Sequence, residues 1–300
     1  MLSIIVCSRY KTLPKEFVDN VADTIGIDYE VIAIDNSKNE HSIFSAYNKG
    51  LAKAQFPNVC FVHEDVFFHT KSWGQIVLGY LQDPKTGIIG LAGGDLVTRV
   101  PAAWSACITQ SINIIQSDRT GKRPTKTIKE PENWNQTKRS VITLDGVFMC
   151  MRRDLFEKIR FDEKLAGFHG YDFDISVQST VAGYTNYVIY NIELEHFSRG
   201  STNDIYFRNL VAIFKKWGSN LPLMTDYISE QQPTTLQKIE IDNLLRLIKK
   251  MARKGINSNE IISSANYFAA IIGAKREVRC LRMRIFLIRL FNSPKYLLKK

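Results

Sequence analysis

Apolar and polar positions alternate along the first part of the chain in two different rhythms. Residues 2–7, 29–34 and 59–62 are short apolar runs rich in β-branched side chains, which predicts buried strands. Residues 16–25 and 43–54 lie between these runs and carry apolar side chains close to a 3.6-residue period, which predicts helices. Strands that alternate with helices are typical of a parallel sheet whose two faces are both covered.

The pattern becomes less regular after residue 72. It predicts a helix at 73–81, strands at 88–92, 141–144 and 187–190, an apolar run at 147–151, a helix that begins near Arg153 and another that ends near Ala182. Residues 111–140 have no apolar period and are rich in Lys, Arg, Thr, Pro and Asn. We therefore predict a long loop over a cleft there, because loops of that length are more often functional or mobile than structural.

The C-terminal part of the chain differs from the rest in pattern and in charge. Residues 221–235 hold two prolines and few apolar residues, which predicts a linker, and the pattern beyond them is helical. We expect an α/β domain at 1–220 and a basic helical extension at 221–300. Residues 1–235 carry 25 Lys and Arg against 26 Asp and Glu, whereas residues 236–300 carry 15 against 4. The net charge of +10 therefore comes from the extension.

The segment KREVRCLRMRIFLIRLF at 275–291 combines regularly spaced arginines with bulky apolar residues. A helix of this kind suits an anionic membrane surface, so residues 275–300 are our candidate for membrane contact. The alternative is a helix that packs on the α/β domain and leaves its arginines in water. Nucleic acid would also suit a basic tail, but the chain has no recognised nucleic-acid motif, so we do not expect that partner.

Three observations bear on the compartment. The five cysteines are odd in number and have no metal-like spacing, which is typical of reduced thiols. The start MLSIIVCSRY has no basic residue before its short apolar run, so it predicts a first strand and no secretory signal. No window approaches the ~18 uninterrupted apolar residues of a membrane span. We expect a cytoplasmic protein, with a peripheral position on the inner face of the cell membrane as the option that the tail suggests.

Polar clusters follow the first three predicted strands, namely Ser8-Arg9, Asp35-Asn36 and His63-Glu64-Asp65. Carboxyl ends of parallel strands meet at one edge of a sheet, where ligands bind. His63 and Asp65 face the same way along a strand, so together they can hold a divalent cation that carries a diphosphate. Glu64 points the other way and is expected to be structural. A strand that merely turns polar at the surface would carry a similar motif.

Seven landmarks in order give the chain a family resemblance. They are IIVCSR, VIAIDNS, SAYNKGLAKA, FVHEDVFF, LDGVFMCMRRDLF, GFHGYDFDIS and EHFSRGS, between residues 2 and 203. In this order they resemble the GT-A glycosyltransferases, in particular bacterial family 2-like enzymes. The resemblance implies a GT-A fold, with a mostly parallel Rossmann-like sheet and helices on both faces. It also implies sugar transfer from a nucleotide diphosphate donor.

The resemblance assigns a metal site and a base. His63-Glu64-Asp65 stands where the family has its DxD motif, with histidine in place of the first aspartate. Asp65 and His196 are the expected ligands of Mn²⁺ or Mg²⁺; His63 is a further candidate ligand, or could instead bond a ribose or phosphate. An inverting transfer needs a carboxylate that takes the proton of the acceptor hydroxyl, and we assign Asp172.

The remaining expected contacts fall into two groups. The donor nucleotide is expected to meet Cys7, Ser8, Arg9, Asp35, Asn36, Asn48 and His63, with uracil as the base that the resemblance places at Asp35. The donor sugar or the acceptor is expected to meet Asp145, Gly146, His169, Tyr171, Asp174, Ser198 and Ser201. Asp174 is also the alternative base or a helix cap. Asp145-Gly146 could equally be a simple turn.

Three functions are weighed for the chain. The leading one is a metal-dependent, inverting glycosyltransferase that uses a UDP-sugar and a glycan or lipid-linked acceptor in bacterial surface polysaccharide synthesis. A sugar-nucleotide pyrophosphorylase of related fold would normally have a glycine-rich loop after its first strand, and IIVCSRYKTLP has no glycine. A non-catalytic polyanion-binding protein would leave the nearly neutral first 235 residues unexplained.

Overall fold

The central sheet has seven strands in this computed structural model, which describes residues 1–117, 125–129, 136–198, 202–226, 228 and 233–274. Their order is β10 (Lys138–Val141), β13 (Thr185–Ile189), β5 (Thr86–Gly90), β12 (Phe148–Arg152), β3 (Asn58–Val62), β1 (Leu2–Ser8) and β2 (Tyr29–Asp35). Strands β1, β2, β3, β5 and β13 run in one direction, and β10 and β12 run in the other. The mostly parallel sheet expected from the sequence is confirmed.

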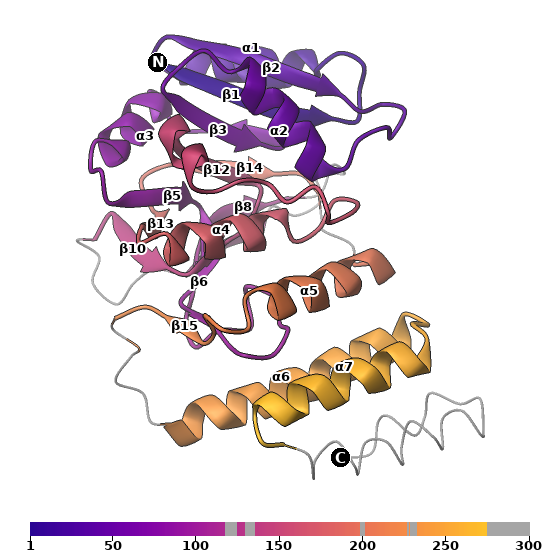
Figure 1. The fold of residues 1–300 in the computed structure, drawn as a ribbon. Helices are drawn as coiled ribbons and strands as arrows, with labels where there is room; N and C mark the ends of the chain where they lie inside the picture. Colours follow the sequence, from indigo (N-terminus) through magenta and orange to yellow (C-terminus); the bar gives the residue numbers. More distant parts are fainter. Residues whose placement is uncertain (118–124, 130–135, 199–201, 227, 229–232, 275–300) are drawn as a thin grey trace.

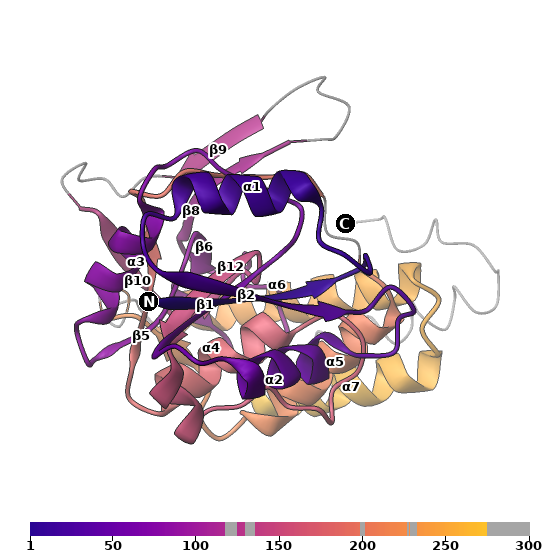
Figure 2. The same cartoon turned by 90° about the horizontal axis from the view of Figure 1, so that it is seen from above.

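Helices cover both faces of this sheet (Figure 2). In β1, Leu2, Ile4 and Val6 belong to the apolar cluster on one face, where α1 (Lys15–Thr24) and α3 (Trp73–Leu81) pack. Ile5 belongs to the cluster on the other face, with α2 (Ile43–Lys53) and α4 (Tyr171–Val181). Side chains of a strand alternate between its faces, and here both faces are buried, so the strand is apolar at nearly every position.

A second sheet lies beside the first and was not expected. Its order is β11 (Thr143–Leu144), β6 (Ala92–Gly94), β8 (Gln110–Gln116), β14 (Leu194–His196) and β4 (Val66–Phe68), with β9 (Thr125–Lys129) on β8. The predicted loop at 111–140 is wrong in part, because it contains β9, nearly all of β8 and most of β10. Strand β8 pairs with β9, the next strand in the chain, but its other partners, β6 and β14, lie in segments before and far after it. These long-range pairings leave no local apolar period.

Two other predicted elements differ from the structure. The strand expected at 88–92 is divided at Leu91, where the chain leaves the central sheet and enters the second one. Gly93 allows a close approach there, because a Cβ on it would lie 2.3 Å from the carbonyl oxygen of Thr143. The helix expected near Arg153 is a short 3₁₀ helix, η1 (Arg153–Glu157).

The C-terminal helices pack against the α/β domain. After α5 (Asp204–Lys216), β15 (Leu223–Met224) pairs with β7 (Leu96–Val97) inside the predicted linker. Helices α6 (Pro233–Arg253) and α7 (Ser258–Ile271) follow, beneath α5 in Figure 1, and join the core cluster of the α2 face. Residues 275–300, which hold the predicted membrane segment, lie outside the described residues. No helix in the described part of the chain is long and apolar enough to span a bilayer.

Candidate functional site

The turn between β3 and β4 carries the His63-Glu64-Asp65 motif. The backbone N–H of His63 donates to the carbonyl oxygen of Val147, and the N–H of Phe197 donates to that of Asp65. Strand β14 pairs with β4 so that His196 lies opposite Val66, next to Asp65 in the chain. The second sheet therefore brings His196 to a motif that lies far away in the sequence, as expected from the resemblance.

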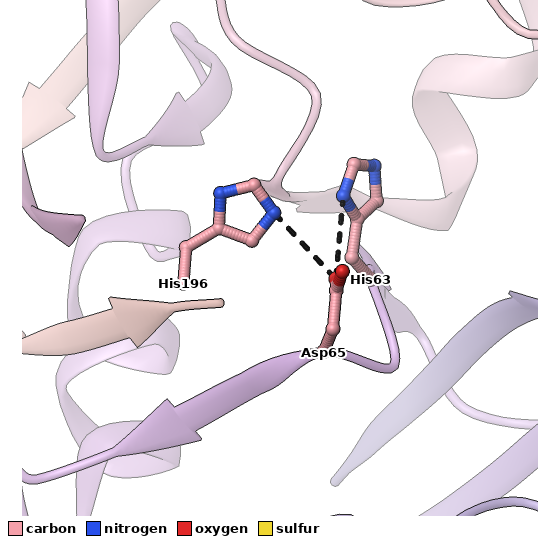
Figure 3. A group of neighbouring side chains, drawn as sticks. All are labelled: His63, Asp65 and His196. Atoms are coloured by element: carbon pink, nitrogen blue, oxygen red, sulfur yellow. Dashed lines mark ion pairs between the residues drawn. The ribbon is translucent and has the colours of Figure 1, made fainter. Parts of the chain in front are cut away.

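His63, Asp65 and His196 form a cluster with the geometry of a metal site (Figure 3). The Oδ1 atom of Asp65 lies 3.5 Å from Nε2 of His196 and 3.9 Å from Nδ1 of His63. One ligand atom from each residue lies within 4.8 Å of those of the other two. Oδ1 of Asp65 is buried and has no hydrogen-bond partner among the described residues, so these three side chains fit a divalent cation.

The electrostatics of the cluster also favour a bound cation. Burial alone would raise the pKa of Asp65, but its interactions with His196 and His63 hold that pKa well below its usual value. Burial, and then the neighbouring His196, lowers the pKa of His63. At neutral pH the carboxylate is therefore ionised and the His63 imidazole is neutral, which are the forms that bind metal.

Arg9 lies beside the motif and pairs with both of its carboxylates. Nε of Arg9 donates to Oε1 of Glu64 at 2.7 Å, and an Nη atom donates to Oδ2 of Asp65 at 3.3 Å. The Glu64 side chain is 5% exposed, which agrees with the structural role expected for it. The Arg9 side chain is 58% exposed, so the same guanidinium is also accessible to an anionic ligand.

Asp172 lies in the first turn of α4 and faces the turn between β11 and β12. Its carboxylate accepts the backbone N–H groups of Gly146 and Phe173. Burial, and then the charge of Asp145, raises the pKa of Asp172 to about 7. Asp145 itself accepts the indole N–H of Trp104 at 3.0 Å. A carboxyl group with a pKa near neutrality is suited to accept a proton during catalysis.

Tyr171 connects this turn to the candidate metal-binding cluster of His63, Asp65 and His196. Its hydroxyl lies 3.1 Å from the carbonyl oxygen of Gly146 and 2.9 Å from Nε2 of His63. A Cβ on Gly146 would lie 2.1 Å from that hydroxyl oxygen, so only glycine fits at this position. The expected site residues Gly146 and Tyr171 therefore lie in direct contact.

One cavity of about 550 Å³ joins these groups. It is lined by many of the expected site residues, namely His63, Asp145, Gly146, His169, Tyr171, Asp172, His196 and Ser198. The hydroxyl of Ser198 lies 3.1 Å from Nε2 of His196. Burial lowers the pKa of His169, whose ring packs on Tyr206. The cavity thus brings together the two chemical groups that the sequence predicted separately, the metal-binding cluster and the candidate base.

Five of the residues expected at the nucleotide lie at the carboxyl ends of β1 and β2, namely Cys7, Ser8, Arg9, Asp35 and Asn36. Ser8 and Asp35 are neighbours in the sheet, and Asp35 is exposed. Bonding to Ser37 lowers the pKa of Asp35. The amide of Asn36 closes a loop by bonding both backbone groups of His41. Burial raises the pKa of Cys7 to about 11, which argues against a nucleophilic thiolate.

Asn48 and Asp174 lie apart from both of these groups. Like Cys7, Ser8, Arg9, Asp35, Asn36 and Asp65, they do not line the cavity. Asn48 donates to the carbonyl oxygen of Phe161 and to Glu163, and it lines a separate, shallower cavity. Asp174 is buried and accepts from Lys216 and from the indole of Trp217. Helix geometry explains the case of Asp174, because residues two positions apart point to different sides of a helix. Ser201 lies outside the described residues.

Sequence reasoning missed several residues of this cavity. Gln116 anchors the end of β14, because its amide donates to the carbonyl oxygens of His196 and Ser198. It lies in the segment that was predicted as a loop, so no strand pattern drew attention to it. Trp104 and Tyr206 also line the cavity, and their neighbours in sequence give no signal of this.

Comparisons with known proteins identify the family of this chain and the solved structures that it resembles. The model of the Glycosyltransferase like family matches residues 3–203, which is more than half of the chain. A search of curated protein sequences found no match. Among solved structures, S. aureus TarS 1–349 in complex with UDP-GlcNAc has a TM-score of 0.54 at 12% identity, over 90% of this chain and 81% of that one.

Two further structures are similar at lower scores. S. aureus TarS has a TM-score of 0.47 at 12% identity, and the match covers 82% of this chain. This chain spans only 43% of the length of that protein. GalNAc-T7 with UDP, GalNAc and Mn²⁺ has a TM-score of 0.46 at 14% identity, over 81% of this chain and 54% of that one. The likeness to TarS 1–349 supports the GT-A fold expected from the sequence. The family match over residues 3–203 shows that the chain belongs to the glycosyltransferase-like family.

Proposed function

We propose that this glycosyltransferase moves a sugar from a UDP-sugar to a hydroxyl group of a glycan or lipid-linked acceptor, with inversion at the anomeric carbon and with a divalent cation. One observation carries this proposal. His63 and His196 of the metal-binding cluster line the same cavity as Asp172, whose pKa is about 7. A cation site for a diphosphate and a proton acceptor for a hydroxyl are the two groups that such a transfer needs.

Support for a UDP-sugar comes from the site and from a structural neighbour. TarS 1–349 has the same fold and is in complex with UDP-GlcNAc. In this chain, Ser8 and Asp35 end two adjacent parallel strands, and the cation cluster follows a third. Ligands of open α/β sheets bind at this edge. The cavity volume of about 550 Å³ lies within the usual range for small-molecule sites.

In the proposed reaction, the acceptor oxygen attacks the anomeric carbon of the donor. The bond between that carbon and the diphosphate oxygen breaks, and the diphosphate leaves with the bonding electrons. Asp172 takes the proton of the acceptor hydroxyl and later releases it to water. A cation held by Asp65, His196 and His63 would offset the negative charge of the diphosphate. Arg9 would add a positive charge at the same edge.

The walls of the cavity suit a sugar acceptor. Trp104, Phe168 and Tyr206 line it, and the Phe168 side chain is exposed. Aromatic rings present flat apolar surfaces, against which the apolar face of a sugar ring can pack. We propose that the acceptor belongs to bacterial surface polysaccharide synthesis. The protein would reach it at the inner face of the cell membrane, which it would contact through residues 275–300.

Two variants test the proposal by separating binding from chemistry. UDP should bind the unchanged protein more tightly with Mn²⁺ or Mg²⁺ than with EDTA, and Asp65→Ala should remove that difference. Asp172→Asn should keep the metal-dependent binding but lower turnover of the preferred UDP-sugar by ~10²-fold or more, because proton transfer matters only in the transition state. Calorimetry and a UDP-release assay give the two readouts. Equal UDP affinity with and without metal would contradict the proposed site.

A further inference from the structure

The two imidazoles of the metal-binding cluster each have a second partner outside it. Nε2 of His63 lies 2.9 Å from the hydroxyl oxygen of Tyr171. Nδ1 of His196 lies 3.4 Å from Oε1 of Gln116. These contacts use the ring nitrogens that face away from Asp65, and Figure 3 shows the other nitrogen of each ring pointing to the Asp65 carboxylate. In a neutral imidazole one nitrogen carries the proton and the other carries a lone pair.

The hydrogen bonds of Tyr171 identify the protonated nitrogen of His63. The Tyr171 hydroxyl has a single proton, which it donates to the carbonyl oxygen of Gly146 at 3.1 Å. Toward His63 the same oxygen can therefore only accept, so the proton of that bond belongs to Nε2 of His63. Nδ1 of His63 is left with its lone pair, which points at the buried Oδ1 of Asp65.

Gln116 fixes His196 in the same way. The side-chain NH₂ group of Gln116 donates to the carbonyl oxygens of His196 at 2.9 Å and Ser198 at 2.6 Å. This orients the amide so that its oxygen faces the His196 ring and accepts from Nδ1. Nε2 of His196 then carries the lone pair. The Ser198 hydroxyl, which can rotate, lies 3.1 Å from this nitrogen.

We propose that Tyr171 and Gln116 are positioning residues that set the two histidines in opposite tautomers, so that two nitrogen lone pairs and one carboxylate oxygen converge on a site that prefers a transition ion such as Mn²⁺ over Mg²⁺. The inference rests on the proposed function, because the proposed function identifies the bound group as a divalent cation. Nitrogen ligands favour first-row transition ions, whereas Mg²⁺ takes almost exclusively oxygen ligands. The hydrogen bond with Tyr171 thus keeps His63 in the tautomer that can bind the metal ion.

The first experiment measures the tautomer of His63 directly. Long-range ¹H–¹⁵N NMR of the metal-free protein at pH 8 distinguishes a protonated Nε2 from a protonated Nδ1, and His63→Gln assigns the signal. We expect a protonated Nε2 in the unchanged protein. A His63 ring protonated at Nδ1 would overturn the proposal, and this measurement needs no variant of Tyr171 to fold.

The second experiment measures Mn²⁺ affinity by electron paramagnetic resonance, without nucleotide. Tyr171→Phe should weaken Mn²⁺ binding by ~10- to 100-fold, because outer partners of metal-bound histidines have effects of that size. The matched control is Tyr47→Phe. Tyr47 packs on Tyr171 with ring centroids 5.4 Å apart, so this variant removes a neighbouring buried hydroxyl and keeps the contact between Tyr171 and His63. Unchanged Mn²⁺ affinity in folded Tyr171→Phe, or an equal loss in both variants, would overturn the proposal.

Competition with Mg²⁺ tests the preference itself. The unchanged protein should hold Mn²⁺ at least ~10-fold more tightly than Mg²⁺, and His63→Asp should remove most of that ratio because an oxygen replaces a nitrogen. A ratio near one in the unchanged protein would contradict the proposal. These titrations use the metal alone, so they succeed or fail independently of UDP-sugar turnover, on which the proposed function depends.

Discussion

Burial and the nearby charge of Asp145 together raise the pKa of Asp172. Burial has the largest effect on the pKa of Asp172, and the Asp145 charge adds to it. The backbone N–H groups of Gly146 and Phe173 act in the opposite direction, because they stabilise the ionised form. The resulting pKa of about 7 leaves Asp172 partly ionised at neutral pH.

This coupling predicts a change in pH dependence. A general base is active when deprotonated, so kcat/KM of the unchanged enzyme should fall as the pH drops through about 7. Asp145→Asn removes a neighbouring negative charge, which lowers the pKa of Asp172 and moves the acidic limb of the profile to lower pH. The measurement is the pH profile of kcat/KM with a UDP-sugar.

The control for this prediction is Asp154→Asn, because the Asp154 side chain is 65% exposed and lies in η1. It should leave the acidic limb in place. A limb that stays near pH 7 in Asp145→Asn would mean that another group sets it.

At the scale of elements, short turns hold the site together. The turn between β3 and β4 carries the His63-Glu64-Asp65 motif, and the turn between β11 and β12 carries Gly146. Helix α4 begins beside the second turn, so that Tyr171 and Asp172 at its start reach different groups. The close approach of Gly146 to Tyr171 is what allows α4 to lie there. Packing at this turn therefore controls the orientation of His63.

Gly146→Ala should disturb both stability and metal binding. The added methyl group would lie 2.1 Å from the Tyr171 hydroxyl oxygen, so the ring must move away from His63. Overpacking of this kind costs about 1–3 kcal/mol. We expect a lower free energy of unfolding in urea, and a weaker Mn²⁺ affinity.

Gly79→Ala is the matched control for that substitution. Gly79 lies in α3, and an added Cβ would meet no atom within 4 Å from the described residues outside the adjoining turns of its own helix. Alanine should stabilise this helix by up to ~1 kcal/mol and leave Mn²⁺ binding unchanged. Normal stability and affinity in Gly146→Ala would show that the turn can relax without moving Tyr171.

At the scale of the whole molecule, the described part of the basic extension is built into the fold. Glu240 of α6 has a fully buried side chain that accepts two hydrogen bonds from the Arg99 guanidinium, at 2.9 and 2.6 Å. Leu244 and Ile248 of the same helix belong to the core cluster of the α/β domain. The domain boundary at residue 220 stays a prediction, but the contacts favour a longer folded unit that includes α6 and α7.

Two truncations separate the roles of the extension. A chain cut after residue 235 loses α6 and α7, which leaves Arg99 without Glu240 and uncovers apolar side chains. We expect it to aggregate or to have a lower Tm. A chain cut after residue 274 keeps these helices and should keep the Tm of the full chain.

Sedimentation with anionic vesicles then tests membrane contact. The full chain should sediment with phosphatidylglycerol vesicles at low salt, and the chain cut after residue 274 should not, because each basic residue near such a surface contributes ~1 kcal/mol. Full-length protein that stays in solution at low salt would contradict the membrane proposal.

The amino-acid sequence by itself determined the alternation of strands and helices and the order of the landmarks. Runs such as 2–7 and 59–62 are apolar at almost every position because strands buried on both faces need no polar side. The same local rule places His63 and Asp65 directly after one strand, in the turn that follows β3. These features depend on neighbours in sequence, and a single chain displays them directly.

Only the tertiary structure decided which of the candidate residues meet. Strand β8 pairs with β14, which lies far away in the sequence, so the place of Gln116 beside His196 leaves no local pattern. Asp172 and Asp174 look equivalent in the sequence, but one faces the cavity and the other is buried against Lys216 and Trp217. Tautomers, pKa values and cavities arise from contacts between distant segments, because hydrogen bonds and burial act through space.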